Sequence, residues 1–333
     1  MRGTSAVRAG LVILVVSMSA LFVPAAGAQI VVGQVSPTVP TESFCNLPDP
    51  FDEVQIGVQG GTSYAAPAAG VLTSWSVNEG PGSGSLGMKV FRPLGGGAYL
   101  VVGHDGPRPL TPNSLNTFPV SIPVLAGDIV GTALPANAGV SCVFETGLAG
   151  DVIGFRKGLA SDGQSISQEE TYGEFRLNVS AMLLPPPVIN TISPSKASIK
   201  GASVVIGGAN FASVSAVSFG SLPAAGFTIN SEGQITAQAP ASKTLGKVPV
   251  TVTTVAGTAT SAQSFTYEGC KVPQLKGKKL KAAKKKLAKA NCTLGKVKKL
   301  HGATGKTGKV VKQGPKPGTI LVPRSKVKIT LDV

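Results

Sequence analysis

Glycine and proline interrupt this chain so often that long helices are excluded as its main structure. The 333 residues include 42 Gly and 25 Pro, and only 14% of the residues are charged. Gly in a helix interior costs about 1 kcal/mol relative to Ala, and Pro costs about 3 kcal/mol. Short strands connected by turns tolerate both residues. We therefore expect a mainly β protein, with a length that suits about two or three domains.

The net charge of +15 is concentrated at one end of the chain. Residues 270–333 contain 19 Lys or Arg and one acid, a net charge of +18. Residues 29–184 contain six bases and 13 acids, a net charge of −7, and residues 185–269 carry +2. The C-terminal segment is a local polycation, and its self-repulsion favours an anionic partner.

The N-terminus has the pattern of an export signal. Arg2 and Arg8 give a positive start, 13 apolar residues follow at 11–23, and residues 26–28 offer a small-x-small cleavage site. An uncleaved membrane anchor is the alternative, but this run is shorter than the ~20 residues that a spanning helix needs. We expect residues 1–28 to be a signal peptide, and the mature protein to be secreted with no membrane span.

Four Cys in an exported chain favour two disulfides over a metal site or a nucleophile. The spacings contain no C-x-x-C motif, and three pairings are possible. We favour Cys45–Cys142 and Cys270–Cys292, because each pair then lies within one expected domain. With only two His, at positions 104 and 301, a His-rich metal centre is excluded.

Residues 29–184 have the pattern of a β-sandwich, because short β-branched and aromatic runs alternate with Gly/Pro clusters. Val71, Thr73, Trp75 and Val77 alternate with other side chains, so we expect them to share one buried face. Trp75 is then a core residue and not a platform for sugars. The run at 122–131 resembles the strand–turn–strand opening of jelly-roll domains, but we can name no family for this segment.

Catalytic and metal-binding patterns in this segment are weak. Residues 82–87 match G-x-G-x-x-G, but a strand-like run follows in place of the required helix, so we interpret them as a turn. His104 and Asp105 are neighbours in a Gly-flanked turn without a G-x-S-x-G elbow, which disfavours a hydrolytic triad. A carboxylate pair or a Ca²⁺ site, without supporting D-x-D-x-D spacing, could draw on Asp49, Asp52, Glu53, Glu79 and Asp128.

Residues 185–268 begin with a stiff Pro185-Pro186-Pro187 linker and continue as short strands and turns. Val248, Val250 and Val252 alternate with polar residues, and Gly207-Gly208 and Gly220 stand where turns would need positive φ. With the runs at 187–194, 200–211, 217–220, 235–240 and 265–267, this segment resembles an IPT/TIG immunoglobulin-like domain along its whole length. The resemblance implies a small sandwich that serves as a binding or spacer module without catalytic residues.

Residues 269–333 open with Val-Pro-Gln-Leu-Lys-Gly at 272–277, before the only clear helix pattern of the mature chain. Leu280, Ala283, Leu287 and Ala290 form a narrow apolar stripe, and lysines cover the rest of the circumference. With a Gln-x-Pro-x-x-Gly-Thr run and a Val-x-Ile-x-Leu end, the segment resembles a small α+β PASTA domain over all its length. It departs from that family at Arg324, where the family usually has Gly.

This expected fold is compatible with a Cys270–Cys292 disulfide. Six extended residues after Cys270 run out about 20 Å. A helix of about 13 residues from Lys278 returns about the same distance. The two Cys can therefore meet, and the bridge would stabilise a small domain whose lysines repel one another.

The PASTA resemblance implies a bacterial, extracellular protein associated with peptidoglycan, and it brings no catalytic residue or cofactor. We therefore expect a secreted, non-enzymatic, cell-wall-associated protein whose partner is peptidoglycan or another anionic wall polymer. Nucleic acid is disfavoured as the partner, because residues 270–333 contain no aromatic side chain to stack on bases. The expected anion-binding residues are Lys278, Lys281, Lys285, Lys289, Lys312, Lys316 and Arg324.

Two other functions stay open at this stage. The N-terminal domain could be a carbohydrate-binding or hydrolytic module that the C-terminal domains target to the wall. The chain could also be a structural surface protein, whose acidic and basic ends would pair between neighbouring copies at low salt. The sequence does not decide the oligomeric state.

Overall fold

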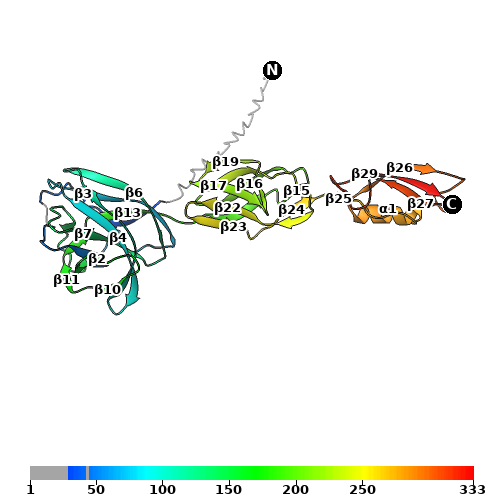
Figure 1. The fold of residues 1–333 in the computed structure, drawn as a ribbon. Helices are drawn as coiled ribbons and strands as arrows, with labels where there is room; N and C mark the ends of the chain where they lie inside the picture. The colour runs from blue at the N-terminus through cyan, green and yellow to red at the C-terminus, as the bar shows by residue number, and fades with distance from the viewer. Residues whose placement is uncertain (1–28, 43–44) are drawn as a thin grey trace, which may run out of the picture.

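The computed structural model describes residues 29–42 and 45–333, so the expected signal peptide lies outside the described residues. The described chain is mainly β, with one helix, and it forms three bodies in chain order (Figure 1). Each body has its own cluster of buried hydrophobic side chains. The expected fold class is therefore confirmed.

The N-terminal body is a sandwich of two antiparallel sheets and one further strand pair. The four-stranded sheet has the order β1 (Ile30–Gln34), β13 (Val179–Leu184), β3 (Gly70–Glu79) and β6 (Ser114–Val124). The seven-stranded sheet has the order β10 (Ser165–Ser167), β5 (Ala98–Pro109), β4 (Ser85–Gly95), β7 (Ile129–Leu134), β2 (Phe51–Gly57), β9 (Val152–Lys157) and β11 (Glu170–Gly173). The further pair is β8 (Val143–Glu145) with β12 (Phe175–Leu177). The chain crosses between the large sheets after β1, β2, β3, β5 and β6, as a jelly-roll-like sandwich does.

Trp75 lies in the core of this sandwich, as predicted, but its strand is not regular. Its side chain is fully buried, packs on Phe118 and donates a hydrogen bond from Nε1 to Asp105 Oδ2 at 2.8 Å. The expectation that Val71 and Thr73 share its face is wrong. A bulge between Leu72 and Ser74 shifts the register, so Leu72 is buried in their place.

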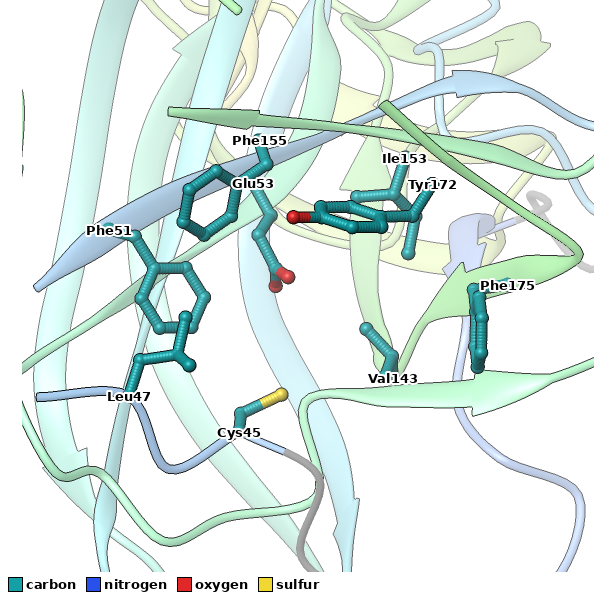
Figure 2. Close-up of a pocket in the computed structure, with 9 residues that line it drawn as sticks. All are labelled: Cys45, Leu47, Phe51, Glu53, Val143, Ile153, Phe155, Tyr172 and Phe175. Carbon is teal, nitrogen blue, oxygen red and sulfur yellow. The ribbon is translucent and has the colours of Figure 1, made fainter. Parts of the chain in front are cut away.

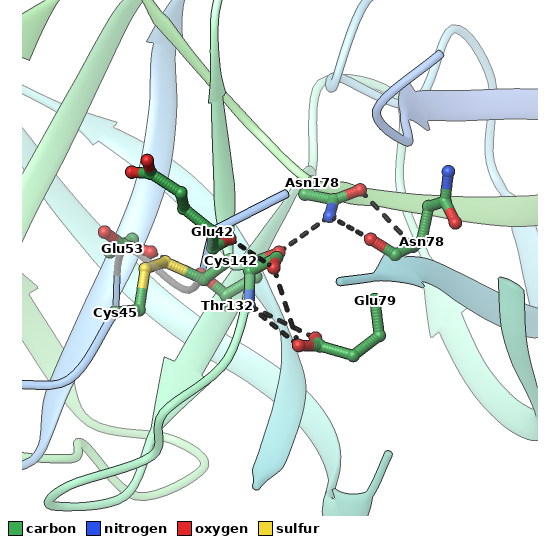
Figure 3. Close-up of a disulfide and its surroundings, with 9 residues drawn as sticks. Glu42, Cys45, Glu53, Asn78, Glu79, Thr132, Cys142 and Asn178 are labelled. Atoms are coloured by element: carbon green, nitrogen blue, oxygen red, sulfur yellow. Dashed lines mark hydrogen bonds between the residues drawn. A yellow bond between two sulfur atoms is a disulfide. The ribbon is translucent and has the colours of Figure 1, made fainter. Parts of the chain in front are cut away.

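The predicted disulfide Cys45–Cys142 is present, with a Cα–Cα distance of 5.9 Å (Figure 3). Polar contacts hold the segment that carries Cys142 against the end of β3. The Ser141 amide donates to Glu79 Oε2 at 3.1 Å, and Asn178 Nδ2 donates to the Ser141 carbonyl at 2.6 Å. The disulfide and these bonds together fix the end of the sandwich next to Glu53 (Figure 3).

Five acids are buried in this body, and three of them pair with a basic side chain. The pairs are Lys89 with Asp52, Arg92 with Asp128 and Arg176 with Asp151, at N–O distances of 2.6, 2.8 and 2.8 Å. Glu79 instead accepts a hydrogen bond from the Ser141 amide. Glu53 accepts one hydrogen bond, from the Thr132 hydroxyl at 2.9 Å, and burial raises its pKa to about 7.

The second body is a small sandwich of short strands. One sheet has the order β14 (Val188–Ser193), β16 (Ser203–Ala209), β20 (Gln234–Gln238) and β19 (Gly226–Ser231). Another has the order β18 (Leu222–Pro223), β17 (Val214–Phe219), β22 (Val250–Thr254) and β23 (Gly257–Thr260). A third has the order β15 (Lys196–Ser198), β24 (Phe265–Glu268) and β21 (Gly246–Val248). Val250 and Val252 are fully buried and Val248 packs against the same core, as their alternation predicts.

The predicted role of the glycines in this body is half right. Gly220 has a φ of +63° in a turn, as expected. Gly207 and Gly208 instead lie within strand β16, and neither has a positive φ. A Cβ at Gly208 would lie 1.8 Å from the Val188 carbonyl oxygen, so the close approach of β14 requires glycine there.

The third body packs one helix on a three-stranded sheet. Helix α1 (Leu280–Lys289) is shorter than the expected 13 residues, because Lys279 is already extended and Asn291 has a φ of +53°. The sheet has the order β26 (Thr293–Lys299), β29 (Lys326–Asp332) and β27 (Lys309–Gly314), and a separate pair is β25 (Cys270–Lys271) with β28 (Ile320–Leu321). Ala283 and Leu287 are buried, and Leu280 and Ala290 pack against this core, so the predicted stripe is confirmed.

Two sequence features of this body have clear structural causes. Gln313 accepts a hydrogen bond from the Leu275 amide at 2.8 Å and donates to the Pro273 carbonyl at 3.0 Å. It thereby ties the opening segment to β27.

Arg324 has a φ of +62°. This is the left-handed region that glycine adopts without strain, which explains why the family prefers Gly there.

We predict that the Cys270–Cys292 disulfide, which is present and closes a loop of 22 residues, stabilises the third body by about 3 kcal/mol. Replacing both Cys with Ala should lower its free energy of unfolding by about that amount. Hydrogen exchange of residues 271–333 in the full chain, as a function of urea, measures this. Adding salt should restore part of the loss, because the lysines then repel less. An unchanged unfolding free energy would contradict the prediction.

We also predict that Glu53 makes the first body less stable as pH rises. Its pKa is raised from an ordinary 4.5 to about 7, so the folded state holds the proton more tightly than the unfolded state. Stability is then greatest below pH ~4.5 and falls until pH ~7, by on the order of 3 kcal/mol. Glu53→Gln should remove most of this dependence in urea unfolding between about pH 4.5 and pH 8, whereas exposed Asp162→Asn should keep it.

Candidate anion-binding site

The third body presents its positive charge entirely to solvent. All 19 of its Lys and Arg side chains, between Lys271 and Lys328, are exposed. None of them lies within 4.0 Å of an acid among the described residues. The one acid of this body, Asp332, accepts a hydrogen bond from His301 Nδ1 at 2.9 Å, which lowers its pKa. The cations are therefore free to meet an external anion.

One set of cations lies on helix α1. Lys281, Lys285 and Lys289 recur every four residues, so they form one row on the exposed side of the helix. Lys278 precedes the helix and is also exposed. These four predicted residues make a ridge of exposed lysines on and just before the helix.

A second set lies on the sheet face that α1 does not cover. Along β29, Val327, Ile329 and Leu331 point into the core, so Lys328 and Thr330 point to the open face. Thr330 pairs with Lys298 on β26 and with Lys312 on β27. The two lysines therefore stand on either side of Thr330, with backbones about 10 Å apart.

These side chains form a groove of about 350 Å³ on the open sheet face. Four lysines line it: Lys296, Lys298, Lys312 and Lys328. Gly314, which has no side chain, pairs with Lys328 and leaves room beside it. A phosphate or carboxylate here could receive ammonium N–H bonds from several sides, together with the Thr330 hydroxyl. Such a site can recognise an anion by its charge and by the spacing of its oxygens.

The sequence located only part of this groove. Of the seven predicted residues, Lys312 lines it, four belong to the helix ridge or its start, and Lys316 and Arg324 lie in loops. Lys296, Lys298 and Lys328 were missed. The alternation in residues 326–331 contained the signal for Lys328, because every second residue there is apolar. Lys296 and Lys298 can be assigned to the groove only from the parallel pairing of β26 with β29.

The weaker candidates in the first body do not assemble into a centre. His104 bonds Asp162, at 2.8 Å, and not its neighbour Asp105, which instead pairs with Arg108. No described serine hydroxyl bonds His104. The one cluster of possible metal ligands in the described chain is Cys45, Cys142 and Glu53. Both sulfurs are joined in the disulfide, so Glu53 is the sole donor left there.

Residues 82–87 do not form the predicted turn: residues 82–84 are an irregular connection and residues 85–87 belong to strand β4. The chain continues along this strand and not into a helix. The structural context of a dinucleotide site is therefore missing from this part of the chain.

Solved structures resemble parts of this chain. A putative phosphatase from Bacteroides thetaiotaomicron is 21% identical, over 27% of this chain and 21% of that chain, with a TM-score of 0.22. SGBP-B from a complex xyloglucan utilization locus in Bacteroides uniformis is 14% identical, over 63% and 57%, with a TM-score of 0.23. The plexin A4 extracellular region is 14% identical, over 61% and 17%, with a TM-score of 0.25. The chain thus spans about a fifth of the phosphatase and of the plexin region, and identities and TM-scores this low carry no functional argument.

A search of curated proteins finds no match to this chain. No helix in the described part is both long enough and apolar enough to cross a membrane. Two protein-family models do match, one to residues 187–267 and the other to residues 271–333. Residues 187–267 are therefore an IPT/TIG domain and residues 271–333 are a PASTA domain, and they follow an N-terminal β-sandwich of no named family.

Proposed function

We propose that this chain is a secreted, non-enzymatic binding protein that attaches to an anionic polymer of the bacterial cell wall through its PASTA domain. The observation that carries the proposal is the lysine groove on the open sheet face, with Lys298 and Lys312 on either side of Thr330. PASTA domains are generally linked to peptidoglycan binding. Peptidoglycan offers carboxylates as binding partners for lysines. Phosphate-bearing wall polymers offer the same anionic chemistry.

Charge balance supports a polyanion as the partner. The 19 exposed cations of the PASTA domain repel one another, since no described acid within 4.0 Å neutralises them. Binding a polymer with regularly spaced anions relieves this repulsion at several sites at once. A single small anion would relieve it at only one site.

The IPT/TIG domain suits the role of a short spacer. Strand β24 ends at Glu268 and β25 begins at Cys270, so one residue separates the two domains. A Cβ at Gly269 would lie 2.6 Å from Leu245 and 2.7 Å from the Leu321 carbonyl oxygen. The backbone at this junction is therefore packed too closely for a side chain at position 269. On the other side, the Pro linker is held by Asn210, which donates to the Pro186 carbonyl at 2.8 Å.

The disulfides and the PASTA domain both fit an extracellular protein. Export itself rests on the sequence pattern of residues 1–28. The acidic N-terminal sandwich would then be the part that faces solvent, while the basic end holds the wall.

The test is co-sedimentation with purified, insoluble peptidoglycan. Residues 29–333 should pellet at physiological salt, and a truncation that ends at Glu268 should stay in the supernatant. If neither protein pellets, or if modest salt abolishes pelleting, the wall attachment is wrong. The lysines would then be a nonspecific polycation.

Two triple variants separate the groove from general charge. Lys296→Gln, Lys312→Gln and Lys328→Gln remove three of the four lysines that line the groove, whereas Lys281→Gln, Lys285→Gln and Lys289→Gln remove the same charge from the helix ridge. We predict that the groove variant binds peptidoglycan about tenfold more weakly, because each exposed ion pair contributes about 0.5 kcal/mol. The helix variant should lose clearly less. Equal losses in both variants would contradict a groove-specific site, and a larger loss in the helix variant would move the site to α1.

A further inference from the structure

The N-terminal sandwich contains a pocket that the proposed wall attachment does not use. It encloses about 260 Å³ where β2, β9 and β11 approach β8 and β12 (Figure 2). Its rim includes Leu47 and Tyr172, which are 43% and 46% exposed. Glu53, only 7% exposed, is the one acid that lines it. The pocket therefore opens to solvent at an apolar rim and holds a carboxylate inside.

Aromatic rings form much of its wall. Phe51 and Phe155 lie with ring centroids 5.0 Å apart, and Tyr172 stands edge-on to Phe155 at 6.0 Å. Figure 2 shows the Glu53 carboxylate among these three rings. The negative faces of such rings attract a cation within about 6 Å. Rings and carboxylate thus favour the same kind of ligand group.

Glu53 has no cationic partner within 4.0 Å among the described residues. Its Oε2 accepts the Thr132 hydroxyl at 2.9 Å, and no described donor bonds Oε1. Three of the other buried acids, Asp52, Asp128 and Asp151, each pair with a Lys or Arg. Glu79 has no cation either, but both of its carboxylate oxygens accept hydrogen bonds from Ser141. A buried carboxylate without a counter-ion is costly, and a bound cation would offset that cost.

We propose that this pocket binds an organic ammonium group, with Glu53 as its counter-ion and Phe51, Phe155 and Tyr172 as its aromatic cage. A metal ion is disfavoured because the nearby sulfurs of Cys45 and Cys142 form a disulfide. A neutral apolar ligand would fill the space but leave Glu53 uncompensated. The ligand class is a primary or quaternary ammonium ion on a short apolar stem.

Binding should strengthen as pH rises, because Glu53 must be ionised to act as the counter-ion. Burial raises the pKa of Glu53 to about 7, and nearby Asp52 adds to the rise. The other titratable groups named around the site have partners of their own. They are Asp52 with Lys89 and Arg156, Tyr172 with Glu170, and Arg176 with Asp151.

The experiment is calorimetric titration of residues 29–333 with choline and with n-butylammonium, at about pH 8 and about pH 5.5. The control ligand is 3,3-dimethylbutanol, the uncharged carbon analogue of choline. At least one of the two ammonium ions should bind at pH 8, and about tenfold more weakly at pH 5.5, where Glu53 is mostly protonated. The neutral analogue should bind weakly at both pH values. The ammonium ion that binds more tightly shows whether the pocket prefers a primary or a quaternary nitrogen.

Glu53→Gln should weaken ammonium binding at pH 8 about tenfold and remove its pH dependence. Asp162→Asn removes the same charge from an exposed carboxylate in the same body and should change nothing. Tyr172→Ala, at an exposed rim position, should weaken binding without unfolding the sandwich. No binding of either ammonium ion to the parent protein would overturn the proposal. Equal binding of the neutral analogue, or unchanged binding to folded Glu53→Gln, would also overturn it.

Discussion

Repulsion among the exposed cations of the PASTA domain is the constraint on which its structure depends. Eleven buried hydrophobic residues and one disulfide hold together a domain that carries +18. The core stripe of α1 includes two alanines, so the helix itself contributes little burial. The sheet can leave one face to lysines only because its other face is closed by α1 and by Cys270–Cys292. The disulfide stabilises the domain in spite of the repulsion among its lysines, including those that line the groove.

The N-terminal sandwich handles charge in the opposite way. It is acidic, but most of its buried acids are neutralised within the fold by Lys89, Arg92 and Arg176. Glu53 and Glu79 have no cationic partner, and of the two only Glu53 lines the aromatic pocket and has one carboxylate oxygen without a hydrogen-bond donor among the described residues. A charge left unbalanced in either domain marks the place where a ligand of opposite sign would be stabilised. We therefore propose an anionic polymer as the ligand of the PASTA domain and an ammonium group as the ligand of the N-terminal sandwich.

Sequence patterns predicted the fold well where it depends on residues that are close together in the chain. The alternation of Val248, Val250 and Val252 and the stripe through Ala283 and Leu287 identified the buried faces, because strand and helix periods are fixed by the backbone. The bulge at Leu72 was not predicted, since it depends on pairing with β6 and β13. Gly208 was wrongly predicted to lie in a turn for a similar reason. Glycine is required there because the Val188 carbonyl approaches from another strand.

The candidate sites were less accessible to sequence reasoning. Lys278, Lys281, Lys285 and Lys289 drew attention as a dense run, whereas the groove joins Lys296, Lys312 and Lys328 from three separate strands. Glu53 was one of several acids in the sequence. Its special position depends on which cations the fold brings to the other acids, and no spacing in the chain encodes that.

The most direct test of the central claim is residue-level mapping of the bound surface. Amide chemical shifts of the PASTA domain within residues 29–333 would be followed while soluble peptidoglycan fragments are added at physiological salt. Our account predicts that the largest changes cluster on β26, β27 and β29, around Thr330. Changes confined to α1, or spread evenly over all the lysines, would contradict it.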